Sequence, residues 1–144
     1  MNLTEFLFHL DDDRIVAAIR EAENRSSAEI RVYIADGRPT DPVAAALEHF
    51  DRAGMSRTRD RNAVLVYVAP RSQTFAVVGD EAAHRCCGDG FWQTVSDEMR
   101  QRFGDDPNAA IVHAIFRVAD RLSGEFPCRV DDRNELPDQV LRGR

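Results

Sequence analysis

The feature that most constrains the fold is a pair of apolar runs separated by only four residues. The run AVLVYVA at 63–69 is continuously apolar, which is typical of a strand buried on both faces. The turn at 70–73 follows, and then TFAVVG at 74–79. Parallel strands need a crossover of about a dozen residues or more, so this connection predicts an antiparallel hairpin.

The segments around the hairpin alternate between helix and strand patterns. We expect a helix at about 12–25, capped by acids at 11–13, and then an alternating strand, AEIRVYIA, at 28–35. A second helix is expected between Asp41 and Gly54, and Val43, Leu47 and Phe50 form its apolar stripe. Further helices are expected at 81–87, at 89–103, and between Asp106 and Gly124. This order predicts an α/β fold, a three-layer α/β/α sandwich with a mixed central sheet.

The length and composition bound the domain organisation and exclude several kinds of function. The 144 residues suit a single domain at 1–144, with a core at about 12–126 and an irregular acidic tail at 127–144. The net charge of −6 argues against nucleic acid as a partner. Every Lys or Arg position is arginine, which excludes a Schiff-base mechanism because that chemistry needs a lysine amine.

The same sequence predicts a soluble, cytoplasmic protein. No apolar stretch reaches the roughly 20 residues that a transmembrane segment needs. The N-terminal MNLTEFLFHLDDDR lacks the basic region of a secretory signal. Three cysteines, two of them adjacent, do not make a disulfide framework, so we expect reduced thiols.

Chain routing predicts that acidic residues meet at one edge of the sheet. The first two strands are joined by a helix and should be parallel, and the third returns antiparallel to the second. The start of the first strand, the start of the second and the end of the third therefore share an edge. The acids expected at this edge are Glu29, Asp60, Asp80, Glu81 and Asp89.

Converging carboxylates repel one another unless a positive charge lies between them. One candidate is a hard divalent cation, calcium or magnesium, with these acids as its ligands. The other is arginine, because Arg57, Arg59 and Arg61 flank Asp60. The sequence leaves both alternatives open.

The sequence lacks the common short motifs of several enzyme and metal-binding classes. No Walker loop, dinucleotide-binding glycine turn, nucleophile elbow, zincin helix or EF-hand spacing is present. A zinc site at His84, Cys86 and Cys87 is disfavoured, since adjacent cysteines cannot easily chelate one ion together. Trp92 is expected to anchor its helix to the sheet.

Four segments carry a resemblance to a known family. They are IVAAIREAENRSSAEIRVYI at 15–34, GMSRTRDRNAVLVYVAPRSQTFAVVGDEAAH at 54–84, DGFWQTVSDEMRQRF at 89–103 and DDRNELPD at 131–138. In this order and at this spacing the chain resembles the TPM domain family, in its short, standalone, soluble bacterial branch. The resemblance implies an α/β/α sandwich with an acidic cleft able to bind a divalent metal, often calcium.

Members of that family have been associated with acid phosphatase activity, photosystem II repair and membrane-protein assembly. The resemblance therefore implies two functions for this chain. One is a non-catalytic binding or assembly module that recognises a protein partner through its acidic edge. The alternative is a metal-dependent acid phosphatase, in which the cation would polarise a phosphoryl oxygen. A third hypothesis, independent of the family, is a structural domain with salt-bridged acids and no metal.

Overall fold

The computed structural model describes residues 3–128 and 138–143. The elements in chain order are α1 (Leu3–His9), α2 (Asp12–Glu23), β1 (Ile30–Ala35), α3 (Pro42–Arg52), the 3-10 turn η1 (Met55–Arg57), β2 (Val64–Ala69), β3 (Thr74–Gly79), α4 (Glu81–Phe103), α5 (Pro107–Leu122) and β4 (Leu141–Gly143). Most of the NELPD segment of the tail lies outside the described residues.

The strands form one mixed sheet in the order β3-β2-β1-β4. β1 is parallel to β2 and to β4, and β3 is antiparallel to β2, so the predicted routing is confirmed. Residue Val64 of β2 lies opposite Ile30 of β1 and Gly79 of β3. The start of β1, the start of β2 and the end of β3 therefore meet at one edge of the sheet.

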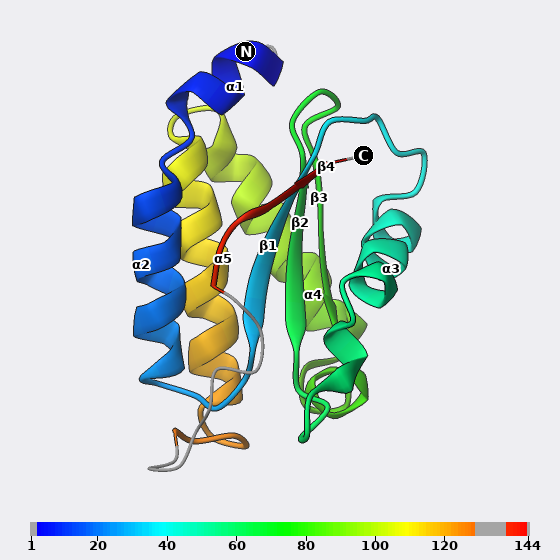
Figure 1. The fold of residues 1–144 in the computed structure, drawn as a ribbon, viewed down its shortest axis with the longest axis vertical. Coiled ribbons are helices and arrows are strands. Elements are labelled where there is room, and N and C mark those ends of the chain that lie inside the picture. The colour runs from blue at the N-terminus through cyan, green and yellow to red at the C-terminus, as the bar shows by residue number, and fades with distance from the viewer. Residues whose placement is uncertain (1–2, 129–137, 144) are drawn as a thin grey trace.

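Helices cover both faces of the sheet, which confirms the predicted sandwich (Figure 1). On one face, α2, α4 and α5 pack against alternate strand residues such as Val32, Val66 and Val77. On the other face, α3 packs against Leu65 and Tyr67. Period-two alternation sends neighbouring strand residues to opposite faces, and both faces are covered by helices. A strand in that position must be apolar throughout, as β2 is.

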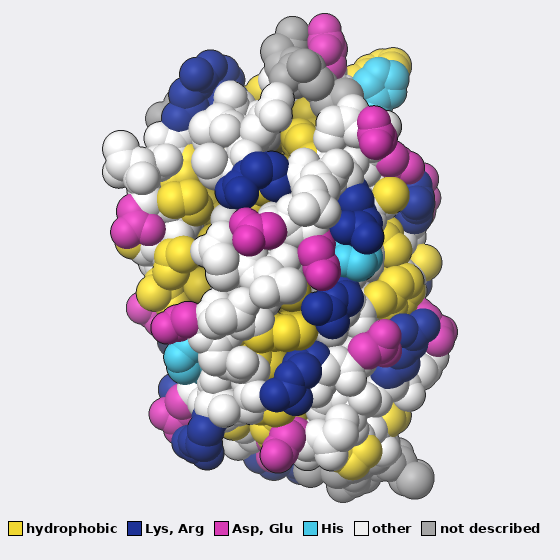
Figure 2. Space-filling view, turned by 180° about the vertical axis from the view of Figure 1, so that it is seen from behind, with side chains coloured by type: hydrophobic (Ala, Val, Ile, Leu, Met, Phe, Trp, Pro, Cys, Tyr) yellow, Lys and Arg dark blue, Asp and Glu magenta, His cyan; other side chains and the backbone are white. Residues whose placement is uncertain are grey.

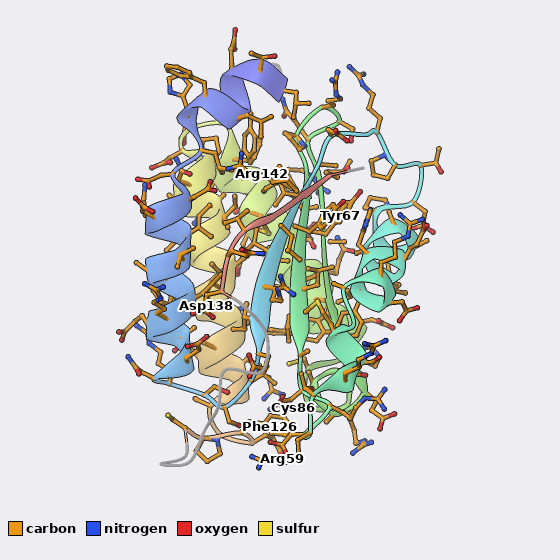
Figure 3. All side chains as sticks on the ribbon, in the orientation of Figure 1. Arg59, Tyr67, Cys86, Phe126, Asp138 and Arg142 are labelled. Atoms are coloured by element: carbon orange, nitrogen blue, oxygen red, sulfur yellow. The ribbon has the colours of Figure 1, made fainter. Side chains whose placement is uncertain are left out.

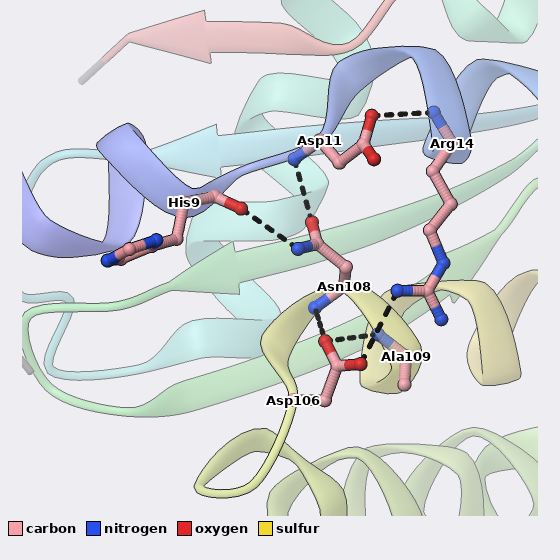
Figure 4. A network of polar contacts seen from close by, with 6 residues as sticks. All are labelled: His9, Asp11, Arg14, Asp106, Asn108 and Ala109. Atoms are coloured by element: carbon pink, nitrogen blue, oxygen red, sulfur yellow. Dashed lines mark hydrogen bonds and ion pairs between the residues drawn. The ribbon is translucent and has the colours of Figure 1, made fainter.

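Aspartates cap the starts of α2, α3 and α5, at Asp11, Asp41 and Asp106, as predicted. The helix expected to start at Asp89 is instead part of α4, which Asp80 caps. Asp106 accepts hydrogen bonds from the backbone N–H groups of Asn108 and Ala109, at 3.1 and 3.2 Å. Asn108 in turn joins the start of α5 to the α1–α2 turn, because its side chain donates to the His9 carbonyl and accepts from Asp11 N, both at 2.9 Å (Figure 4). The Ala109 N–H, with help from Arg14, holds the pKa of Asp106 below its usual value.

The structure differs from the sequence-based expectations in several places. α3 was expected to bury Val43 and Leu47, but these side chains are 49% and 47% exposed. The tail was expected to be irregular, but its last described residues form β4 beside β1. The helices predicted at 81–87 and 89–103 form one element, α4, which kinks where Gly88 has φ +81°.

We predict opposite stability effects for two glycine-to-alanine changes. A Cβ at Gly79 would lie 2.7 Å from Trp92 Cζ2, whereas a Cβ at Gly90, inside α4, would meet nothing within 4 Å. Gly79→Ala should cost about 1–3 kcal/mol of unfolding free energy through overpacking. Gly90→Ala should stabilise by about 0.5–1 kcal/mol, because alanine suits a helix better than glycine does.

Urea unfolding of the two variants beside the parent chain measures both effects. A neutral or stabilising Gly79→Ala would show that Trp92 does not pack on this strand end as described.

Candidate functional site

The predicted acidic edge exists at the level of the backbone. Val64 N donates to the Glu29 carbonyl at 2.7 Å, and Asp80 N donates to the Ala63 carbonyl at 2.8 Å. These bonds tie the starts of β1 and β2 and the end of β3 together. Figure 3 shows Arg59, before β2, and Cys86, after β3, at this same edge. The side chains of the five predicted acids, however, do not all gather at one point.

Asp80 is neutralised by arginine, the alternative counter-charge that the sequence left open. Arg61 Nε donates to Asp80 Oδ2 at 2.6 Å, and Arg61 Nη2 donates to Oδ1 at 2.9 Å. Asp80 Oδ1 also accepts from the backbone N of Glu81 at 2.8 Å, which caps α4. The Asp80 side chain is only 6% exposed, so both of its oxygens are committed inside the protein.

Three of the other predicted acids lie nearer to solvent. Glu81 Oε2 is 3.9 Å from Arg61 Nη2, with a side chain that is 61% exposed. Asp60 Oδ1 is 3.8 Å from Arg59 Nε. Asp89 is 96% exposed and lies 3.9 Å from His84 Nε2. Their contacts are long, surface-type ion pairs, which contribute little to stability.

Glu29 interacts electrostatically with Glu23 and Arg31, a grouping that the sequence did not reveal. Glu29 is buried, and its charge acts on both of these side chains. Burial, together with a hydrogen bond to Asp138, raises the pKa of Glu23 to about 8. Figure 3 shows Asp138 close to α2, at the point where the described tail begins again. The protonated carboxyl of Glu23 thus connects the tail to α2.

These positions bear on the predicted divalent cation. Among the described residues, no group of three or more His, Cys, Asp or Glu side chains is placed to hold a metal ion. Asp80 fits such an ion poorly, because both of its oxygens accept hydrogen bonds from Arg61. A calcium or magnesium ion at this edge stays a prediction, and we derive no chemical step through it.

A groove of about 560 Å³ lies next to the acidic edge, between α3 and α4. Below we call it the α3–α4 groove. Seen from behind, hydrophobic side chains reach the surface on the side where α3 lies (Figure 2). The lining residues are Val43 and Leu47 of α3, Val77, Val78 and Gly79 of β3, and Glu81, His84, Asp89, Trp92 and Gln93 of α4.

The groove has an apolar wall from α3 and a polar wall from α4, and Trp92 also lines it. Leu47 and Val43 form the apolar wall from α3. Trp92, only 5% exposed, packs against Gly79, which confirms that it anchors α4 to the sheet. Its indole Nε1 donates to His84 Nδ1 at 3.0 Å. The lining residues include two carboxylates, Glu81 and Asp89, and neither Lys nor Arg.

The sequence alone did not predict this groove. The signal that could have indicated it is the pair Val43 and Leu47, four residues apart on α3, which we assigned to the core. A helix packed on the end of a sheet can keep such a pair at its edge, where only the tertiary arrangement decides burial.

The vicinal cysteines lie outside the groove lining. Cys86 and Cys87 are half-buried thiols packed against the main core. Burial raises the pKa of Cys87 to about 12, which removes it as a nucleophile near neutral pH. Arg121 Nη2 donates a hydrogen bond to the backbone carbonyl of Cys86 at 2.7 Å. Both cysteines thus pack as small apolar residues.

Comparison with known proteins decides the family. A sequence model described as the TPM domain matches residues 3–121. The chain belongs to the TPM domain family. A solved structure of the BA42 protein, from the psychrophilic bacterium Bizionia argentinensis, is 32% identical, with a TM-score of 0.83 and 92% of each chain covered. No curated protein matches this TPM domain.

Within residues 3–128 and 138–143, no helix of the TPM domain is long and apolar enough to cross a membrane.

For this TPM domain we predict that two of the five acids differ sharply in their effect on stability. Asp80→Asn should cost about 1–3 kcal/mol, because it removes the charge that binds Arg61 from a buried site. Asp89→Asn should change the free energy of unfolding by less than about 0.5 kcal/mol, since Asp89 is almost fully exposed. Urea unfolding curves check both.

The same variants test the cation through thermal melts in EDTA and in calcium. An ion that binds only the folded state would raise the midpoint of the parent chain, and loss of a ligand would remove the rise. Neutralisation of Asp80 by Arg61 alone predicts no calcium-dependent rise, whereas the predicted cation requires one. A rise that both Asp80→Asn and Asp89→Asn abolish would contradict neutralisation by Arg61 alone and establish the cation.

Glu23 should make stability depend on pH. Because its pKa is raised from 4.5 to about 8 on folding, the folded state binds the proton more tightly than the unfolded state does. The contribution of Glu23 is therefore fully present below about pH 4.5 and is lost as pH rises through 8. Urea unfolding between pH 5 and pH 8 should show a steeper fall for the parent chain than for Glu23→Gln. Glu21→Gln, on the same helix and exposed, should behave as the parent does.

Proposed function

We propose that this TPM domain is a non-catalytic binding module that recognises another protein through the α3–α4 groove. The observation that carries the proposal is the chemistry of the groove, which is lined by apolar side chains of α3, by carboxylates of α4 and by the buried Trp92. Concave apolar surfaces with a few placed polar groups are the usual form of a binding site. Val43 and Leu47 leave about half of their apolar surface exposed in this groove.

The groove disfavours the phosphatase alternative. Transfer of a phosphoryl group needs positive charges around its equatorial oxygens. The groove instead carries Glu81 and Asp89, which repel a phosphate. His84, its one imidazole, has Nδ1 engaged by the indole of Trp92. These features suit a cationic or apolar ligand better than an anionic substrate.

We place the module in the cytoplasm, as the sequence predicts. The adjacent thiols of Cys86 and Cys87 support a reducing compartment. Calcium or magnesium at the neighbouring acidic edge would be an accessory to binding, and the melts described above test it.

Affinity capture from extracts of cells that produce the protein tests the function. A partner that uses the groove should be captured by the parent chain and lost with Leu47→Lys, which places a charge on the apolar wall. We expect about a tenfold reduction, the equivalent of about 1.4 kcal/mol. Phe8→Lys is the matched control, because Phe8 is 84% exposed on α1, away from the groove lining.

Equal capture by Leu47→Lys and by the parent chain would remove the groove as the binding surface. Turnover of p-nitrophenyl phosphate that depends on a divalent ion and is lost in Asp80→Asn would favour the phosphatase instead.

A further inference from the structure

The α3–α4 groove contains one open edge of the sheet. Among the residues that the structure describes, β3 is an outer strand and pairs with β2 alone. Asp80 N donates to Ala63 O, so Asp80 forms a hydrogen-bonded pair with the segment that leads into β2. In an antiparallel ladder, alternate residues direct their backbone groups inward and outward. The backbone N–H and C=O groups of Gly79 and Val77 therefore point away from β2, and both residues line the groove.

We propose that the groove binds an extended polypeptide segment that adds to β3 as a further strand and alternates apolar with basic side chains. The proposal rests on the proposed function and names its ligand. Adding a strand to an open sheet edge is a recurring mode of peptide recognition, in which backbone hydrogen bonds give affinity and alternate side chains give specificity.

The two walls determine which side chains the segment carries. Successive residues of an added strand point to opposite faces of the sheet. One set would meet the apolar wall of Val43 and Leu47 on α3, and the other would meet Glu81 and Asp89 on α4. An aliphatic residue matches the first wall, and arginine or lysine matches the second. The required pattern is therefore apolar, basic, apolar, basic.

Charge excludes a second copy of this chain as the preferred occupant. The strand that a second copy would offer, TFAVVG at 74–79, has no basic side chain to match Glu81 and Asp89, and each copy carries a net charge of −6. Like charges in such a contact are destabilising. A basic segment is attracted electrostatically to the groove, whereas a second acidic copy is repelled.

The chain already uses strand addition at the other side of its sheet. The short strand β4 lies parallel to β1, where Leu141 is the partner of Tyr33. Among residues 3–128 and 138–143, no segment takes the equivalent place beside β3. Within the described residues β3 and β4 are the two outer strands of the sheet, and β3 is the one that lines the groove.

An acetylated and amidated eight-residue peptide, VRVRVRVR, is the probe, and Trp92 is the reporter. Trp92 is the only tryptophan of the chain, so its fluorescence reports the groove directly. We expect a saturable change on titration, together with slowed hydrogen exchange at the Val77 and Gly79 amides. N-methylation of alternate peptide bonds, which removes donors but keeps every side chain, should weaken binding about tenfold.

Matched variants separate the two walls. Leu47→Lys should weaken binding of VRVRVRVR about tenfold. Asp89→Asn should weaken it about threefold at low salt, as for one exposed ion pair. Asp105→Asn, an exposed change in the α4–α5 turn, should leave it unchanged. The peptide VEVEVEVE should not bind.

Three results would overturn the proposal. They are no saturable response to VRVRVRVR, equal binding of the N-methylated peptide, and a dimer of the free chain with protected Val77 and Gly79 amides. Failure of the peptide while capture still depends on Leu47 would remove strand addition and leave the proposed function standing. Failure of the Leu47 dependence as well would remove both.

Discussion

The short turn between β2 and β3 is the constraint on which the rest of the structure depends. Gln73 N closes it by donating to the Pro70 carbonyl at 3.2 Å, and Gln73 has φ +51°. Because the chain reverses in so few residues, β3 must return antiparallel to β2 and become the last strand of the sheet. α4 then begins at once from Asp80 and crosses one face, while α3 already covers the other. An open strand edge between two helices is the direct consequence.

Electrostatics at the adjacent edge follows from burial more than from the number of acids. Asp80 is buried and capping, so it requires a close positive charge, and Arg61 supplies it through two hydrogen bonds. Glu23 is held beside Asp138 and Glu29, and it responds differently, by keeping its proton. An exposed acid such as Asp89 needs neither solution, because water screens it. Acids that the topology brings to one region of the sheet are therefore stabilised in different ways, according to their burial.

Much of the fold could be predicted from the sequence, and the reasons are local. Apolar periodicity, Asp-Pro helix starts and one short turn indicated the helices around the sheet and the directions of the first three strands. Side-chain placement could not be predicted in the same way. Leu47 and Phe50 follow the same helical pattern, yet Phe50 is buried and Leu47 is half exposed, because the width of the sheet decides where coverage ends. Arg61 and Arg59 are equally good partners in sequence, but only Arg61, at φ +52°, reaches Asp80. The strand at 141–143 has no signal of its own, since it exists only by pairing with β1.

An open strand edge is a risk for any protein, because identical molecules can pair through it and aggregate. A short added strand, as β4 is beside β1, covers part of an edge, but it also removes that part as a binding site. Carboxylates on the flanking helix offer a different solution. Glu81 and Asp89 leave the backbone of Gly79 and Val77 accessible and make the approach of a second acidic copy unfavourable. The same two charges that disfavour pairing with another copy of the chain favour a basic strand. Resistance to aggregation and specificity for the ligand then have one physical origin.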